Sequence, residues 1–178
     1  MTLLVSSADA RNLKLMAFDV DGVLTDGRLY YGPDGEALKV FNTLDGHGLK
    51  KLAASGVTLA LITGRDTPMV ARRAAELGIQ HVIQGREDKG VALADLAASL
   101  GVTARETSYA GDDDSDGPAL QWAPIAIAPS SAHDYARAAA DPARRARGGE
   151  GRGRGDCARP LRTRGARGQR AEAGTAPG

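Results

Sequence analysis

Short apolar runs alternate along the chain with longer segments in which apolar residues recur every three or four positions. The runs predict strands at residues 13–20, 57–62, 81–84, 107–110 and 124–128. Helices are predicted from Asp45 as N-cap to Gly56, at 66–77 and 87–100, through Leu120 and Trp122, and at 131–139. Strands that alternate with helices in this way predict an α/β domain with a parallel sheet.

One segment breaks this alternation. Residues 28–41 hold two short runs with aromatic and β-branched residues on either side of Gly32-Pro33-Asp34-Gly35, which predicts a β-hairpin. The hairpin carries many apolar side chains for a free ribbon: Leu29, Tyr30, Tyr31, Val40 and Phe41. Apolar groups of this number indicate that the hairpin packs against something, such as a second subunit.

Polar residues whose side chains can take part in catalysis or binding follow the predicted strands directly. Asp19 and Asp21 come at the end of the first strand, Thr63-Gly64 after the second, and a cluster at 112–116 after the fourth. Side chains in a strand repeat every two residues, so Asp19 and Asp21 are expected to point the same way. Ligands of parallel sheets bind at the carboxyl ends of the strands, where these groups are predicted to converge with Lys89.

Each of these signals has an ordinary structural interpretation. Asp-Gly and Thr-Gly occur in turns, Lys89 could be a solvated lysine, and three successive aspartates could be a solvated loop. Together, at successive strand ends, they favour phosphoryl transfer. One carboxylate attacks phosphorus, a second protonates the leaving oxygen and later activates water, and a cation, a lysine and a hydroxyl stabilise the transferred group.

The segments DVDGVLTD, LITGR, Lys89 and GDDDSD resemble the motifs of the haloacid dehalogenase-like phosphatases. The resemblance implies a three-layer Rossmannoid parallel sheet, a short β-hairpin insertion and no large cap domain. It implies that Asp19 is the nucleophile and Asp21 the general acid/base. Mg²⁺ would be held by Asp19, the backbone carbonyl of Asp21, and Asp112, and the implied phosphate-binding and supporting residues are Thr63, Gly64, Lys89, Asp113 and Asp116.

From about Lys14 to Ala140 the chain is similar to one branch of this family, the 3-deoxy-D-manno-octulosonate (Kdo) 8-phosphate phosphatases of lipopolysaccharide biosynthesis. This implies hydrolysis of Kdo 8-phosphate to Kdo and phosphate through an aspartyl-phosphate. It also implies a homotetramer that assembles through the hairpins at 28–41 of four subunits and in which neighbouring subunits cap each active site. Besides Asp21 and Lys89, the implied substrate-binding residues are Asn42, Thr43, Leu44, Asp45, Gly46, Lys50, Arg65 and Arg73.

Three alternatives stay open at this point. A phosphatase of a related nonulosonate 9-phosphate shares these motifs. A phospho-receiver domain also uses an acidic cluster, a Thr and a Lys, but places its phosphoacceptor after a middle strand, where this chain has Thr63. A catalytically idle relative that only binds sugar phosphates would keep some of the motifs, whereas all of them are present here.

Charge separates the chain into two parts. Residues 1–141 carry 13 Lys and Arg against 19 Asp and Glu, a net charge of −6, whereas residues 142–178 carry 10 Arg against 3 acidic residues, a net charge of +7. The acidic part disfavours nucleic acid and suits a metal site. We divide the chain into an N-terminal arm (1–12), a phosphatase domain (13–140) and a basic tail (141–178), without a membrane span or signal pattern and therefore expected in the cytoplasm.

The basic tail departs from the family pattern, which ends in a Gly-rich turn and an apolar helix that reaches a neighbouring active site. From Pro142 on there is one Leu and no Val, Ile, Met or aromatic residue, which predicts disorder. A change of reading frame is the favoured interpretation, ahead of a natural basic tail and an RNA-binding arm. Because all the motifs precede the tail, the phosphatase chemistry is expected to survive such a change, whereas capping is not.

Overall fold

The computed structural model describes residues 11–140 of the 178-residue chain. Residues 1–10 and 141–178 lie outside the described part, and with them most of the predicted N-terminal arm and the whole of the basic tail. Within residues 11–140, no helix is long and apolar enough to cross a membrane.

Five parallel strands form the central sheet, as the sequence predicts. They are β1 (Leu15–Phe18), β4 (Thr58–Ile62), β5 (His81–Ile83), β6 (Thr107–Ala110) and β7 (Ile125–Ile127), in the order β5-β4-β1-β6-β7. The central strand β1 pairs with β4 on one side and β6 on the other, with Phe18 opposite Leu61 and Ala110. The carboxyl ends of these three strands therefore meet at one place.

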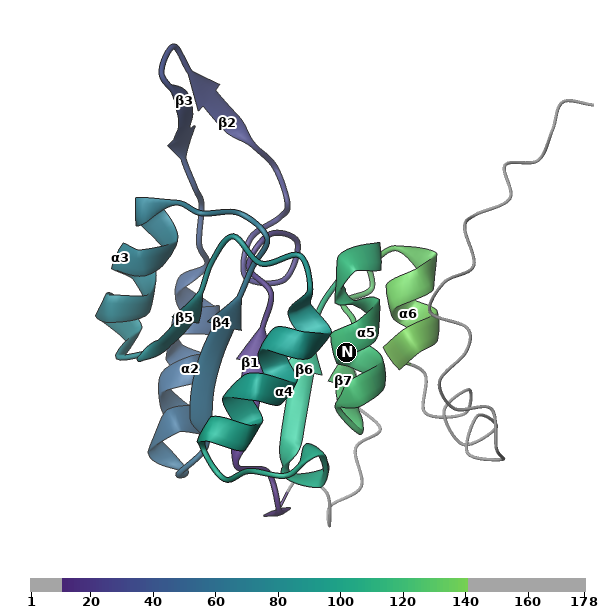
Figure 1. Ribbon diagram of the computed structural model, residues 1–178. Coiled ribbons are helices and arrows are strands. Elements are labelled where there is room, and N and C mark those ends of the chain that lie inside the picture. The colour runs from purple at the N-terminus through teal and green to yellow at the C-terminus, as the bar shows by residue number, and fades with distance from the viewer. Residues whose placement is uncertain (1–10, 141–178) are drawn as a thin grey trace, which may run out of the picture. The chain divides into compact units, whose positions relative to one another are not determined.

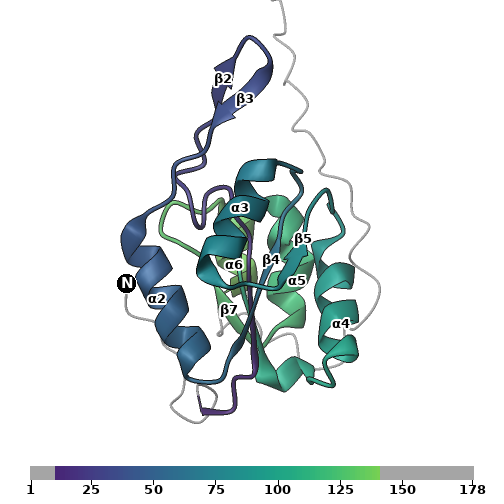
Figure 2. The ribbon, with the colours of Figure 1, turned by 90° about the vertical axis from the view of Figure 1, so that its left-hand side faces the viewer.

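Helices cover both faces of the sheet. One face packs on α2 (Thr43–Ala54) and α3 (Pro68–Leu77), and the other on α4 (Lys89–Ser99), α5 (Gly117–Trp122) and α6 (Asp134–Ala140). Figure 2 shows α2 and α4 on opposite sides of the strands. In β1, Leu15 and Ala17 join the core under α4, whereas Met16 and Phe18 join the core under α2. This two-sided burial explains why the strand is apolar at successive positions.

The predicted hairpin is present. It consists of the antiparallel strands β2 (Tyr30–Gly32) and β3 (Gly35–Leu38) and projects beyond the end of the sheet in both views (Figures 1 and 2). Several of its large apolar side chains are exposed: Leu29, Tyr30, Tyr31, Leu38 and Val40. Phe41 at its base instead packs against the core under α2.

The helix ends differ from the sequence prediction at one informative place. Asn42, not Asp45, is the N-cap of α2: it has an extended backbone and its side chain accepts a hydrogen bond from the Leu44 N–H at 2.9 Å. Asp45 lies in the first turn instead. Asn and Asp are comparable N-caps. Asn42 takes this position because the chain comes out of the hairpin with an extended backbone at this residue. The predicted stop at Gly78 is confirmed, because this glycine caps α3 with φ +74°.

Candidate active site

The candidate site lies where β1, β4 and β6 end. Asp19 follows β1, Thr63 follows β4, and Gly111 and Asp112 follow β6. The Asp19 N–H donates to the Ala110 carbonyl at 2.8 Å, which fixes the end of β1 against the end of β6. Asp19 and Thr63 are both buried. The sheet register therefore brings together residues that are far apart in the sequence.

Lys89 is buried beside Asp19 and is not a solvated lysine. It opens α4, its side chain is 3% exposed, and its Nζ lies 3.1 Å from Asp19 Oδ2 and 2.9 Å from Asp116 Oδ1. Burial opposes the charge on this amine, but the two carboxylates outweigh burial and raise the pKa of Lys89. One cation thus faces two buried carboxylates, and the cluster keeps an excess of negative charge.

Asp116 anchors this cluster through both of its oxygens. Oδ1 accepts from Lys89 Nζ and from the Tyr109 hydroxyl at 2.7 Å, and Oδ2 accepts from the Asp112 and Asp113 N–H groups at 2.8 and 3.1 Å. Asp113 in turn accepts from the Ser115 N–H and hydroxyl, and these bonds outweigh burial and lower the pKa of Asp113. Sequence reasoning missed Tyr109, because nothing in its strand marks it as different from a core aromatic.

Oxygen atoms suited to a divalent cation remain in the same place. Carboxylate oxygens of Asp19, Asp112 and Asp116 lie within 4.8 Å of one another. Both oxygens of Asp116 already accept two hydrogen bonds each, so we assign it a supporting position rather than a ligand position. Asp19 Oδ1 and Asp112 Oδ1 are instead buried, and neither has a hydrogen-bond partner within residues 11–140. Two such carboxylates fit a hard, oxygen-binding cation such as Mg²⁺.

The electrostatics of the two carboxylates favour the binding of a cation. Burial, then repulsion by Asp116, raises the pKa of Asp19 to about 7. Burial, then repulsion by Asp116 and Asp113, raises the pKa of Asp112 to about 6. A bound cation would favour the ionised form of both groups.

This electrostatic conflict predicts a pH-dependent stabilisation by Mg²⁺. The folded-state pKa values of Asp19 and Asp112 lie above their ordinary value of 3.8, so the metal-free protein loses stability as pH rises from about 4 to about 7. Mg²⁺ binds the ionised carboxylates and must displace protons at low pH. We expect Mg²⁺ to raise the melting temperature more at about pH 8 than at about pH 5, relative to NaCl of equal ionic strength. Equal shifts at both pH values would contradict the assignment.

Gly22 makes room for the Asp112 carboxylate. A Cβ at this position would lie 1.9 Å from Asp112 Oδ2, and the residue has φ +87°. The glycine after Asp21 is therefore required twice, once by its backbone conformation and once by its contact with a carboxylate from another strand end.

We expect Gly22→Ala to weaken Mg²⁺ binding about 10–100-fold, because it displaces a carboxylate that fits the cation. The matched control is Gly56→Ala, since Gly56 has φ +92° and a Cβ there would meet nothing within 4 Å. Both variants carry backbone strain of about 1–2 kcal/mol, but only Gly22→Ala adds the clash. Calorimetric titration with Mg²⁺ compares them, and equal affinities would show that Gly22 serves the backbone alone.

Asp21 lies in a turn rather than in a strand, so the predicted alternation with Asp19 does not apply. β1 ends at Phe18, and the Val20 carbonyl accepts from the Leu24 N–H at 2.9 Å. The Asp21 carboxylate pairs with Lys39 of the hairpin, and Arg65 Nε lies 4.0 Å from it. Because of this turn, the carboxylates of Asp19 and Asp21 have different neighbours: Lys89 contacts Asp19, and Lys39 contacts Asp21.

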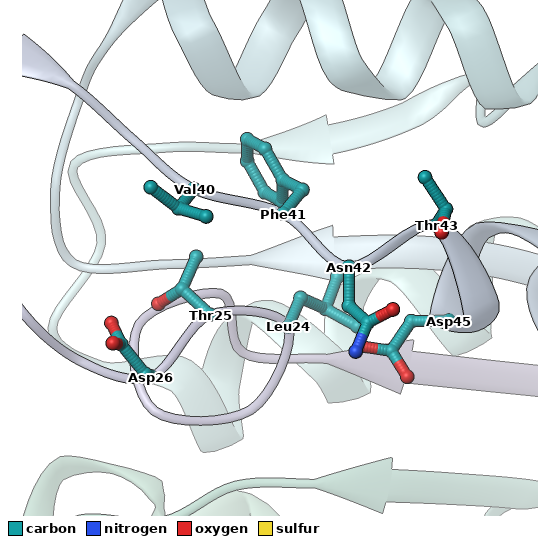
Figure 3. Close-up of a pocket in the computed structure, with 8 residues that line it drawn as sticks. All are labelled: Leu24, Thr25, Asp26, Val40, Phe41, Asn42, Thr43 and Asp45. Carbon is teal, nitrogen blue, oxygen red and sulfur yellow. The ribbon is translucent and has the colours of Figure 1, made fainter.

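A pocket of about 540 Å³, lined by both polar and apolar side chains, opens beside the base of the hairpin (Figure 3). Three predicted substrate-binding residues line it, namely Asn42, Thr43 and Asp45. The structure does not place the other predicted substrate-binding residues in its lining: Asp21, Leu44, Gly46, Lys50, Arg65, Arg73 and Lys89. Leu44 is 76% exposed, and the acidic cluster lies outside the lining as well.

Arg73 lies close to this pocket nonetheless. Its Nη2 donates to the Asn42 carbonyl at 3.4 Å, and its guanidinium lies 5.7 Å from the centre of the Phe41 ring. A Cβ on Gly46 would lie 2.5 Å from Arg73 Nη2, so the glycine lets the guanidinium approach α2. Arg73 therefore places a cation next to residues that line the pocket.

Comparison with known proteins gives a consistent family. No family model matches the chain. The Kdo 8-phosphate phosphatase of Escherichia coli K12 is 40% identical over 150 residues, covering 84% of this chain and 80% of that protein. The Haemophilus influenzae enzyme of the same name is 42% identical over 140 residues, covering 79% and 78%.

A solved structure agrees with these relatives. The Kdo 8-phosphate phosphatase of Moraxella catarrhalis, in complex with a magnesium ion, a phosphate ion and a Kdo molecule, is 44% identical, with a TM-score of 0.72 over 74% of this chain and 76% of that chain. None of these relatives is a phospho-receiver domain. The chain belongs to the haloacid dehalogenase-like family of 3-deoxy-D-manno-octulosonate 8-phosphate phosphatases.

Proposed function

We propose that this protein is a Mg²⁺-dependent phosphomonoesterase that hydrolyses Kdo 8-phosphate to Kdo and inorganic phosphate. Relatives that carry this activity in their names cover most of the chain. The observation that carries the proposal is the buried group at the strand ends. There, Lys89 contacts Asp19, while Asp19 Oδ1 and Asp112 Oδ1 are buried and find no hydrogen-bond partner in the described part of the chain.

In this proposal Asp19 is the nucleophile. Its carboxylate attacks phosphorus, the ester oxygen leaves, and an aspartyl-phosphate forms. Lys89 neutralises the transferred phosphoryl group from its buried position, and the Thr63 hydroxyl with the Gly64 amide binds phosphate oxygens. Asp116 supports this arrangement because it orients the Lys89 amine, and Asp113 supports the loop that holds Asp112.

Asp21 is the proposed general acid/base. It donates a proton to the leaving oxygen of the sugar in the first step and accepts a proton from water in the second. Water then attacks the phosphorus of the aspartyl-phosphate and releases phosphate, which restores Asp19. The separate partners of the two residues, Lys89 for Asp19 and Lys39 for Asp21, allow these different tasks.

Asp19, the backbone carbonyl of Asp21, and Asp112 are the proposed ligands of Mg²⁺. When bound, the ion supplies positive charge that offsets the carboxylates and the phosphoryl oxygens. The protein contributes the donor atoms and their spacing, which Asp116 and Gly22 maintain through Asp112.

The sugar acid is proposed to occupy the pocket beside the hairpin. Asn42, Thr43 and Asp45 offer hydrogen-bonding groups in its lining, and Arg65 and Arg73 supply positive charge for the carboxylate of the substrate. Leu44, Gly46 and Lys50 complete the proposed substrate-binding set from α2.

We also propose a cytoplasmic homotetramer that assembles through the hairpin. The support is a row of exposed apolar side chains on β2, on β3 and beside them. In an isolated subunit these side chains face water, which favours their burial against another subunit. A neighbouring subunit that covers them would close the pocket at the base of the hairpin.

The experiment that tests the function is phosphate release from Kdo 8-phosphate. We expect turnover with Mg²⁺ and none in excess EDTA, with recovery when Mg²⁺ is restored. A nonulosonate 9-phosphate serves as the competing substrate under the same conditions. A clear preference for the nine-carbon sugar acid would reassign the substrate, and turnover that is insensitive to EDTA would refute the metal requirement.

A further inference from the structure

A second buried lysine lies outside the Asp19 cluster. The Lys39 side chain follows β3 and is 1% exposed, whereas Lys14, also in an ion pair, is 60% exposed. Its Nζ contacts Asp21 Oδ1 and lies 3.1 Å from Glu36 Oε1. Burial of an ammonium group is unfavourable unless carboxylates compensate it. Because the Lys39 side chain is buried, it does not serve to make the surface of the hairpin soluble, and its position indicates another role.

Lys39 belongs to a closed ring of alternating charges. Glu36, which also contacts Lys39, lies 3.6 Å from Arg65 Nη2, and Arg65 Nε returns to Asp21 at 4.0 Å. The Arg65 Nη2 group also donates to the Tyr31 hydroxyl at 3.2 Å. Two cations thus balance two carboxylates, and the ring joins both hairpin strands to the turn after β1.

The two oxygens of Asp21 differ within this ring. Oδ1 is held by Lys39, whereas Oδ2 is buried and accepts no hydrogen bond from any residue that the structure describes. A carboxylate fixed through one oxygen cannot rotate freely, so the other oxygen keeps a defined place. Arg65 Nε lies 4.0 Å from this second oxygen.

We propose that Lys39 is a positioning residue for Asp21. It holds Oδ1 so that Oδ2 stays available to the leaving oxygen, and Glu36 holds Lys39 in place from β3. The inference rests on the proposed function of Asp21 as general acid/base. It gives the hairpin a second task, because a change in the position of β3 moves the residue that orients the proton donor.

The test is Lys39→Met, which keeps the length of the side chain and removes its charge. It is assayed on an alkyl ester, Kdo 8-phosphate, and on p-nitrophenyl phosphate, whose leaving group departs without a proton. We expect kcat on the alkyl ester to fall about 10–100-fold more than kcat on the aryl ester, within the range that general acid catalysis supplies. Asp21→Asn should give the same pattern with a larger ratio, and Lys14→Met should leave both rates unchanged.

Other outcomes would overturn the inference. Equal losses on both esters, together with a lower melting temperature, would assign Lys39 a structural role only. A higher KM for Kdo 8-phosphate at unchanged kcat would make it a substrate contact, and unchanged kinetics would remove its role. Should Lys39→Met fail to fold, Glu36→Gln decides: a selective loss on the alkyl ester supports the inference, and any other result refutes it.

The same measurements separate this inference from the proposed function. A wild-type chain that hydrolyses the nonulosonate ester instead of Kdo 8-phosphate refutes the proposed substrate, and the ratio for Lys39→Met is then taken on that alkyl ester. A wild-type chain that hydrolyses no ester refutes the proposed function, and the inference about Lys39 falls with it. Retention of the Mg²⁺-induced rise in melting temperature by Lys39→Met shows that the Asp19 cluster is intact.

Discussion

Asp19→Asn is expected to abolish Mg²⁺-dependent phosphate release, a loss of at least about 10⁴-fold. An amide oxygen is a poor nucleophile toward phosphorus, and the variant cannot form the aspartyl-phosphate. The substitution removes one carboxylate from the group at the strand ends, so Mg²⁺ should also bind more weakly. Phosphate release under single-turnover conditions measures the loss without interference from product release.

Asp19→Asn should raise the melting temperature of the metal-free protein although it abolishes phosphate release. Burial raises the pKa of Asp19 from 3.8 to about 7, so the metal-free wild type loses stability as pH rises from about 4 to about 7. The amide in Asp19→Asn cannot ionise. In EDTA we therefore expect this variant to have a higher melting temperature than wild type, by a wider margin at about pH 8 than at about pH 5. This pattern separates a catalytic loss from a folding defect.

The control for Asp19→Asn is Asp95→Asn, on the exposed face of α4. It removes the same charge far from the strand ends and should keep full activity. Undiminished phosphate release by Asp19→Asn would refute the covalent mechanism. A fall in melting temperature at both pH values would show that Asp19 is required for the fold rather than for the chemistry.

The largest loss of stability is expected from Asp116→Asn. Asp116 is fully buried and accepts from four donors, on Lys89, Tyr109, Asp112 and Asp113. An asparagine of the same shape has one acceptor oxygen and presents an NH₂ group to the remaining donors. Two donors therefore lose their acceptor, and the buried Lys89 loses one of its compensating charges. We expect a decrease of about 3–5 kcal/mol in the free energy of unfolding.

One opposing effect has to be removed for this measurement. Asp116 also repels Asp19 and Asp112, so its neutralisation relieves strain wherever those groups are ionised. Urea unfolding in EDTA at about pH 5 avoids this, because Asp19 and Asp112, with pKa values of about 7 and 6, are then mostly protonated. The loss of hydrogen bonds is then measured with little relief of repulsion.

Asp114→Asn is the matched control in the same loop. The Asp114 side chain is 58% exposed and pairs with His133 at 2.7 Å. An exposed pair of this kind contributes at most about 1 kcal/mol. Equal free energies of unfolding for the two variants would show that Asp116 is not the anchor of the cluster.

Much of this molecule follows from local patterns in the sequence. The apolar runs predicted the central strands β1 and β4, because these strands are buried on both faces and need apolar residues at successive positions. The position of Asp19, Thr63 and Asp112 directly after such runs placed them at one edge, because parallel strands share their carboxyl ends. Gly78 ended α3 because a left-handed cap favours glycine.

Other features depend on contacts between residues that are distant in the sequence. The sequence analysis predicted Asp45 as N-cap, whereas the structure has Asn42 in this position, where the chain leaves the hairpin with an extended backbone. Lys39 and Tyr109 were missed for the same reason. A lysine in a hairpin and a tyrosine in a strand are ordinary residues until the fold places carboxylates beside them.

The sequence by itself thus determined the α/β architecture, the hairpin and the set of carboxylates at the strand ends. Tertiary structure alone decided which oxygens are occupied by hydrogen bonds and which are left for a cation, and it placed Asp21 in a turn against Lys39. The physical reason is range: hydrophobic periodicity and turn preferences act over a few residues. Burial, ion pairing and the space that Gly22 leaves for Asp112 arise only when distant segments meet.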